Sequence, residues 1–291
     1  MLLYQQIEKN KRKSVLIVIF FILFILFLGS FLTYALEGDW LTGAIISSVV
    51  ALIYVAIVLS QSNRIVMSMN RAQEIKSKSD HPFLWNTVEG LSLAGRIPMP
   101  KVFLIHDPSP NAFAAGLNPE NASVAVTTGL MDRLNREEIE AVIAHEIAHV
   151  KNYDVRLATI AVALVSAISL ISHFGSRLLF YGRRGRGNQQ AAFLLIAFVL
   201  LLVAPFVALF IQLALSRNRE YLADADGAAL CRNPGALASA LKKITSNPNP
   251  VEVASDATAS LYIADPLKKK VSSWFSTHPP PDQRVERLLR M

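Results

Sequence analysis

Apolar runs alternate with polar stretches along this chain. Two uncharged runs, Ser14 to Leu36 and Trp40 to Asn63, flank a short acidic turn, and two more follow at Leu157 to Ser176 and Ala191 to Leu215. At about 1.5 Å per helical residue, each run is long enough to cross a hydrocarbon core of ~30 Å. The pattern therefore predicts an integral membrane protein with four transmembrane helices in two hairpins.

Charges beside these runs predict the topology. Lys9, Lys11, Arg12 and Lys13 precede the first hairpin and Arg64 follows it, whereas its turn carries no positive residue. The positive-inside rule then places the N-terminus and the chain after Arg64 in the cytosol. The loop of the second hairpin opposes this rule with Arg177, Arg183, Arg184 and Arg186. That hairpin either spans or is held within the protein; we expect it to span.

The polar stretches predict a cytosolic α+β domain in two parts, so the mainly α chain divides into residues 1–63, 64–155, 156–215 and 216–291. An amphipathic pattern from Leu84 to Ala94 indicates a helix. Val102 to Ile105, Ala112 to Ala115 and Ser123 to Thr127 read as strands of a small antiparallel sheet. Thr245 to Lys270 is rich in small and turn-forming residues and predicts a mobile loop able to close over the cleft.

Composition supports the membrane assignment. The chain is 52% hydrophobic and 18% charged with a mean hydropathy of +0.36, which is too apolar for an ordinary soluble protein. The net charge is +7, and the basic residues cluster beside the apolar runs without interleaved aromatic residues. We therefore expect a lipid bilayer and no nucleic acid as partner. Cys231 is the single cysteine, which excludes a multi-thiolate zinc site and leaves His and carboxylate ligands.

The segment with the clearest chemistry is His145-Glu146-Ile147-Ala148-His149. Asn135 is a suitable N-cap, and the run from Arg136 to Val150 contains no Gly or Pro, so a helix is predicted. The two histidines are four residues apart and share a face, where one metal ion can bridge them. Glu146 lies one step round the helix, in the position of a general base.

A two-histidine zinc site needs a carboxylate as third ligand, and each bound imidazole needs an oxygen at its other nitrogen. Glu220 and Asp224 lie four residues apart on a predicted helix and fit these two roles. The alternative is that both are solvated acids paired with Arg217 or Arg219.

Three further features are candidates. Asn111, Ala112, Phe113 and Ala114 form a candidate sheet edge to which a substrate backbone can add as a strand, although an ordinary strand is the more common reading. His278 and Arg284, near a basic C-terminal helix, are donors able to stabilise an oxyanion. A basic surface patch at the membrane is the alternative for these two residues.

In this order, the motifs resemble those of HtpX-type membrane zinc metalloproteases, relatives of the eukaryotic CAAX prenyl-protein endopeptidases. The resemblance covers nearly the whole chain, including Thr127-Thr128-Gly129-Leu130. It implies one Zn²⁺ per chain and cleavage of misfolded membrane proteins or unfolded polypeptides. It also implies a location in a bacterial inner membrane, with the site facing the cytosol. By position, it implies His145, His149 and Glu220 as zinc ligands, Glu146 as general base, Asp224 orienting His145, Asn111 to Ala114 along the substrate, and His278 and Arg284 facing the tetrahedral intermediate.

Other functions compete with this one. A membrane scaffold with a structural metal would not need Glu146 beside an open coordination position. A channel or carrier is disfavoured because the apolar runs hold no Asp, Glu, Lys or Arg. A CAAX-type prenyl protease is the enzymatic alternative, and the sequence leaves the oligomeric state open.

Overall fold

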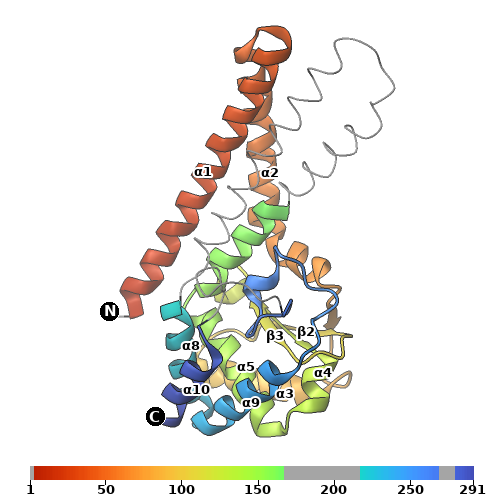
Figure 1. Cartoon of the computed structure of the whole chain (residues 1–291), viewed down its shortest axis with the longest axis vertical. Helices are drawn as coiled ribbons and strands as arrows, with labels where there is room; N and C mark the ends of the chain where they lie inside the picture. The colour runs from red at the N-terminus through yellow and green to blue at the C-terminus, as the bar shows by residue number, and fades with distance from the viewer. Residues whose placement is uncertain (1–2, 167–216, 269–278) are drawn as a thin grey trace.

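The computed structural model describes residues 3–166, 217–268 and 279–291. Two long helices, α1 (Leu3–Glu37) and α2 (Trp40–Met69), rise from a mixed α and β domain (Figure 1). Both are long and apolar enough to cross a membrane, in agreement with the first predicted hairpin. The second predicted hairpin lies mostly at 167–216, outside the described residues; residues 154–166, which enter it, are helical.

The turn between α1 and α2 forms for local reasons. Gly38 adopts a φ of +76°, which a residue without Cβ accepts easily, and Asp39 caps α2 by accepting hydrogen bonds from the Leu41 and Thr42 amides. Large apolar side chains point outward from both helices, among them Leu16, Leu23, Phe27, Ile45 and Leu52. Such a surface is stable facing lipid.

A four-stranded sheet forms the middle of the domain. Its strands are β1 (Gln73–Ile75), β2 (Lys101–Ile105), β3 (Ala112–Ala115) and β4 (Ser123–Thr127), in the order β1-β2-β4-β3. The predicted antiparallel sheet is wrong in one respect: β2 and β4 are parallel, so the sheet is mixed. Strand β3 follows β2 in sequence but pairs beyond β4, because the proline-containing segment between them carries the chain across the sheet. Strand β1 was not predicted.

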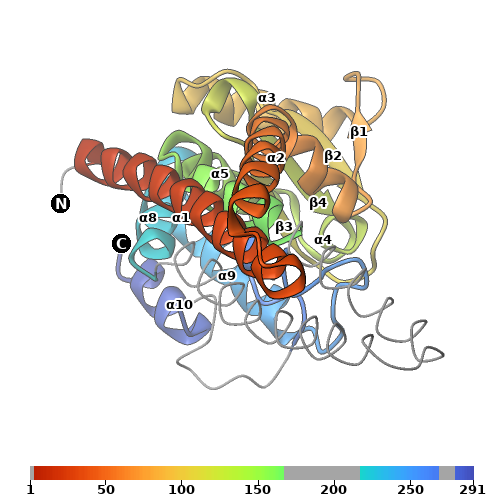
Figure 2. The same ribbon diagram turned by 90° about the horizontal axis from the view of Figure 1, so that it is seen from above.

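Helices cover both faces of the sheet. Helix α5 (Arg136–Lys151) packs on one face in a core that includes α3 (Pro82–Gly95) and α9 (Pro234–Ser246). The end of α2 covers the other face together with Tyr262 and residues of the 154–166 helix. Seen from above, α1 and α2 lie over the domain (Figure 2). The other described helices are α4 (Thr128–Arg133), α8 (Arg217–Cys231) and α10 (Pro281–Leu289), with 3-10 turns at Pro119–Asn121 and Ala259–Leu261.

The segment predicted as a mobile loop able to close over the cleft, Thr245 to Lys270, is instead packed into the domain over its described part. Val251, Tyr262 and Ile263 are at most 2% exposed. Tyr262 donates a buried hydrogen bond of 2.9 Å to Asn70 Oδ1 at the end of α2. The turn-forming residues prevent regular structure, but the apolar residues between them supply the burial that holds the segment.

Candidate metal centre

Helix α5 begins where the sequence predicts. Asn135 and Glu138 form a capping box, in which each side chain accepts the other's backbone N–H at 2.9 Å. The Glu138 carboxylate, 3% exposed, also accepts hydrogen bonds from Ser239 and Lys243 of α9 at 2.6 and 2.7 Å. An apolar stripe along this helix is buried: Ile139, Ile143, Ile147 and Val150. The cap and this stripe together fix the rotation of α5.

That rotation turns two imidazoles toward one point. His145 is fully buried, the side chain of His149 is 13% exposed, and their Nε2 atoms are 3.1 Å apart. Without a cation, a proton on one of these two ring nitrogens must bridge the pair, as in the hydrogen bond between them. A shared metal ion can take the place of that proton.

Glu220 of α8 completes a triangle of donor atoms. Its carboxylate oxygens lie 3.5 Å from His149 Nε2 and 3.9 Å from His145 Nε2. Ligands about 2.0–2.2 Å from a tetrahedral zinc ion are roughly 3.3–3.5 Å apart, close to these three separations. Helix α8 comes this near because Gly227 packs against the backbone of α5 at His145. The donor set therefore fits one zinc ion with a coordination position left over.

Each imidazole has a carboxylate at its other nitrogen. Asp224 Oδ1 lies 3.1 Å from His145 Nδ1, and Asp154 Oδ2 lies 3.2 Å from His149 Nδ1. Burial opposes the charge on His149, but the bond to Asp154 and the charge of Glu220 outweigh it and raise its pKa to about 9. Burial also opposes a charge on His145; there it is the largest effect, and it lowers the pKa of that imidazole. These contacts fix both rings with Nε2 toward the centre.

Arg284 of α10 lies directly behind this shell. It donates two hydrogen bonds to Asp224, from Nε at 2.9 Å and from Nη2 at 2.7 Å, and Nη1 lies 3.4 Å from Glu220 Oε2. The guanidinium is 2% exposed. Burial of the Asp224 carboxyl opposes its charge, yet Arg284 and His145 together lower its pKa. The predicted oxyanion role of Arg284 stays a prediction, because its contacts here are with the ligand shell.

Glu146 is 1% exposed and lies beside the three donors. Burial is the largest cause that raises its pKa to about 7, Glu220 adds to this, and His149 opposes it. The nearby backbone amide of Ala114 acts weakly in the same direction as His149 and favours the charged form. Oε1 has no hydrogen-bond partner within the part of the chain that the structure describes. Oε1 is thus available to a reactant.

The predicted substrate edge has a different environment from the one expected. Strand β3 is an edge strand, as predicted, but its outer side is occupied rather than exposed. Ile263 N–H donates to Ala112 O at 2.9 Å, Asn111 Nδ2 donates to Ala264 O at 3.0 Å, and Phe113 forms a bridge with Tyr262. A substrate role for this edge stays a prediction. His278 lies outside the described residues.

Sequence reasoning missed Asp154 and Gly227. Asp154 follows Tyr153, which lies just after the end of α5 and whose left-handed φ of +58° turns the chain back toward His149. An acidic residue five positions after His149 was the signal in the sequence that could have identified Asp154 as a partner of that imidazole. Gly227 lies seven residues, about two helical turns, after Glu220 and thus on the same face of α8. A glycine on the ligand face of a helix indicates a close helix contact.

The model of peptidase family M48 matches residues 78–291. The chain belongs to peptidase family M48. It is 46% identical over 299 aligned positions to a protein named protease HtpX homolog from Limosilactobacillus reuteri, 47% identical to one from Ligilactobacillus salivarius and 44% identical to one from Listeria monocytogenes. Each alignment covers 100% of both chains.

The HtpX-type resemblance is thereby confirmed, and membership supports a membrane metallopeptidase. Among solved structures, this M48 member is similar to Ste24p from S. mikatae, with a TM-score of 0.47 and 19% identity. That match covers 91% of this chain, which spans 62% of the length of Ste24p.

Proposed function

We propose that this M48 peptidase is a zinc endopeptidase that cuts misfolded membrane proteins or unfolded polypeptides on the cytosolic side of a bacterial inner membrane. One observation carries the proposal: three donor atoms at single-ion spacing lie beside a buried carboxylate with one unpartnered oxygen. A structural zinc site would be closed by a fourth protein ligand, which this cluster lacks among the described residues.

His145, His149 and Glu220 hold the zinc ion in this proposal. When bound, zinc acidifies a water molecule and polarises the scissile carbonyl. Glu146 accepts the proton at Oε1 and delivers it to the leaving amine. Asp224, held by Arg284, keeps His145 Nε2 directed at the ion.

The membrane location supports the choice of substrates. The domain joins α2 directly, so the cluster lies close to the membrane surface if α1 and α2 span it. The positive residues at both outer ends of this hairpin support a cytosolic site. A Lys242→Cys label site in a Cys231→Ala background tests this: an impermeant thiol reagent should label it in inside-out and not in right-side-out vesicles.

Activity is tested on detergent-purified protein, freed of metal by chelation and reloaded with zinc. Wild type should bind one zinc ion and cleave casein. Glu146→Gln should bind zinc equally and lose cleavage by at least about 100-fold, the usual contribution of a general base. Glu140→Gln, an exposed position on the same helix, is the matched control and should behave as wild type. Equal cleavage by Glu146→Gln and wild type would refute the proposed role.

A further inference from the structure

The cytosolic end of membrane helix α1 contacts the outer shell of the metal centre. Asn10 is 4% exposed, and its Nδ2 donates a hydrogen bond of 2.7 Å to Asp154 Oδ1. The other oxygen of the same carboxylate lies 3.2 Å from His149 Nδ1. A continuous chain of polar contacts therefore joins α1 to a metal-binding imidazole, across 144 residues of sequence.

We propose that Asn10 and Asp154 are positioning residues for the metal centre, and that the seating of α1 on the domain sets zinc affinity through them. The proposal rests on the zinc site of the proposed function. Neither residue touches the metal position; each acts through His149.

The chemistry of the three groups requires this arrangement. The Asn10 amide donates to Oδ1, which leaves Oδ2 to accept from the ring nitrogen Nδ1. A proton held at Nδ1 leaves the Nε2 lone pair free for the metal. Asp154 is 4% exposed, so few water molecules can replace the lost donor if Asn10 is removed.

The two imidazoles are supported from opposite ends of the chain. His145 is held by Asp224 and, behind it, Arg284 of the C-terminal helix α10. His149 is held by Asp154 and, behind it, Asn10 of α1. Displacing α1 from the domain therefore weakens one specific ligand, and correct membrane seating becomes a condition for tight metal binding.

The test is zinc affinity of the full chain in detergent, measured by competition with a chelating dye, which needs no turnover. Asp154→Asn, isosteric with aspartate, should weaken binding about 10- to 100-fold, the range for outer-shell partners of zinc ligands. Asn10→Ala should weaken it about 10-fold. Lys9→Ala, the exposed neighbour of Asn10, is the matched control and should bind as wild type.

A double variant separates positioning from general destabilisation. In an Asp154→Ala background, Asn10→Ala should cause no further loss, because the contact it acts through is gone. An equal further loss of zinc affinity in that background would overturn the proposed positioning role of Asn10 and Asp154. A folded Asn10→Ala variant with unchanged zinc affinity would do the same. Failure of wild type to bind zinc would instead overturn the proposed function.

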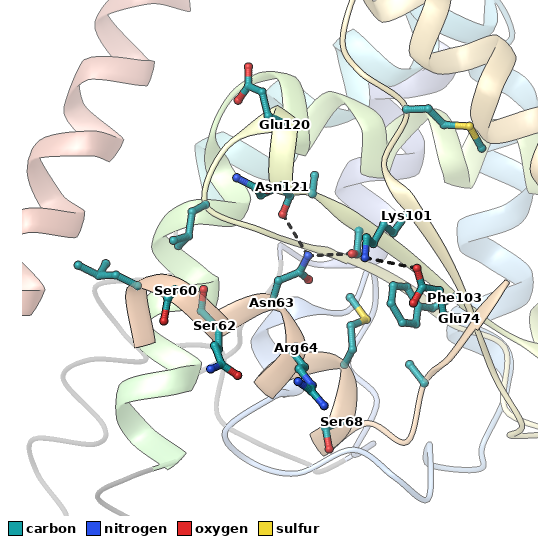
Figure 3. A pocket seen from close by; sticks show the side chains of 18 of the residues that line it. Ser60, Ser62, Asn63, Arg64, Ser68, Glu74, Lys101, Phe103, Glu120 and Asn121 are labelled. Atoms are coloured by element: carbon teal, nitrogen blue, oxygen red, sulfur yellow. Dashed lines mark hydrogen bonds and ion pairs between the residues drawn. The ribbon is translucent and has the colours of Figure 1, made fainter. Parts of the chain in front are cut away.

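A separate observation concerns a cavity of about 1150 Å³ at the end of α2 (Figure 3). Arg64, Arg71 and Lys101 line it, together with the acidic residues Glu74 and Glu120. Lys101 pairs with Glu74 at 3.4 Å, whereas neither arginine has a carboxylate partner in the described ranges 3–166, 217–268 and 279–291. Asn63 Oδ1 in its wall is also buried without a partner among these residues.

This cavity lies at the boundary of the predicted membrane span. Arg64 is the first charged residue after Asp39, and the apolar side chains Leu59 and Leu117 join the polar wall. The two arginines without carboxylate partners, together with this position, match a phosphodiester at the surface of the cytosolic leaflet. We infer that the cavity binds the headgroup of an anionic phospholipid, independently of the metal centre.

Native mass spectrometry of the full chain in phosphatidylcholine nanodiscs, with and without phosphatidylglycerol, tests this inference. Wild type should retain phosphatidylglycerol, and Arg64→Ala/Arg71→Ala should retain at least about 10-fold less. Lys242→Ala/Arg290→Ala, which removes one exposed charge from α9 and one just after its neighbour α10, is the charge-matched control. Equal retention by both double variants would overturn the site, and displacement by millimolar inorganic phosphate would assign it to free phosphate instead.

Discussion

The close packing of α8 on α5 gives a quantitative prediction for Gly227→Ala. A Cβ at this position would lie 2.8 Å from His145 Cα and 2.9 Å from His145 N. Both are backbone atoms of a helix, so no side-chain rotation relieves the contact. The two helices must separate locally to about 3.4 Å, the lower limit of ordinary contact, which is a shift of about 0.6 Å (3.4 − 2.8).

A shift of this size acts on Glu220, about two turns away on α8, because the helix moves as a rigid unit. Metal–ligand distances tolerate only about 0.2 Å. We expect zinc affinity to fall at least about 10-fold, which corresponds to about 1.4 kcal/mol, and the fold to lose about 1–3 kcal/mol through overpacking.

The assay combines zinc competition with thermal unfolding of the metal-free protein. Gly90→Ala is the control, because nothing lies within 4 Å of its added Cβ on an exposed face of α3. That control should be stabilised by about 0.5–1 kcal/mol and bind zinc normally, since alanine is the better helix former. Wild-type zinc affinity in Gly227→Ala would refute the claim that helix separation places Glu220.

Three further predictions follow from buried polar groups. Glu138→Gln should cost about 1–3 kcal/mol of folding stability at neutral pH. Burial opposes the Glu138 charge, but Lys243 and Ser239 lower its pKa, so the charged carboxylate stabilises the fold above the ordinary carboxyl pKa. The difference in melting temperature between wild type and the variant should therefore close as the pH falls below that ordinary pKa. Arg284→Met should cost about 3–5 kcal/mol in urea unfolding, because it leaves the Asp224 carboxylate buried without its cation; a loss under 1 kcal/mol would contradict this. Tyr262→Phe should lower stability by about 1–2 kcal/mol by calorimetry, since it leaves the buried Asn70 oxygen unpaired, and an unchanged melting temperature would argue against that bond.

The sequence by itself determined the features that depend on neighbours within one or two turns. The cap at Asn135, the shared face of His145 and His149, and the apolar length of the first hairpin are local properties, and the structure has all three. The positions of β2, β3 and β4 also followed from local runs between turn residues.

The tertiary structure decided what depends on distant contacts. Strand alternation does not encode the order of strands, so the parallel pairing of β2 and β4 was missed. The burial of Tyr262 and Ile263 along β3 depends on a surface formed some 150 residues earlier. Asn10 and Asp154 meet only because the fold brings the chain after α5 back beside the start of α1, a contact that no local pattern specifies. Helix periodicity and capping act within a turn, whereas packing and polar pairing act across the whole chain.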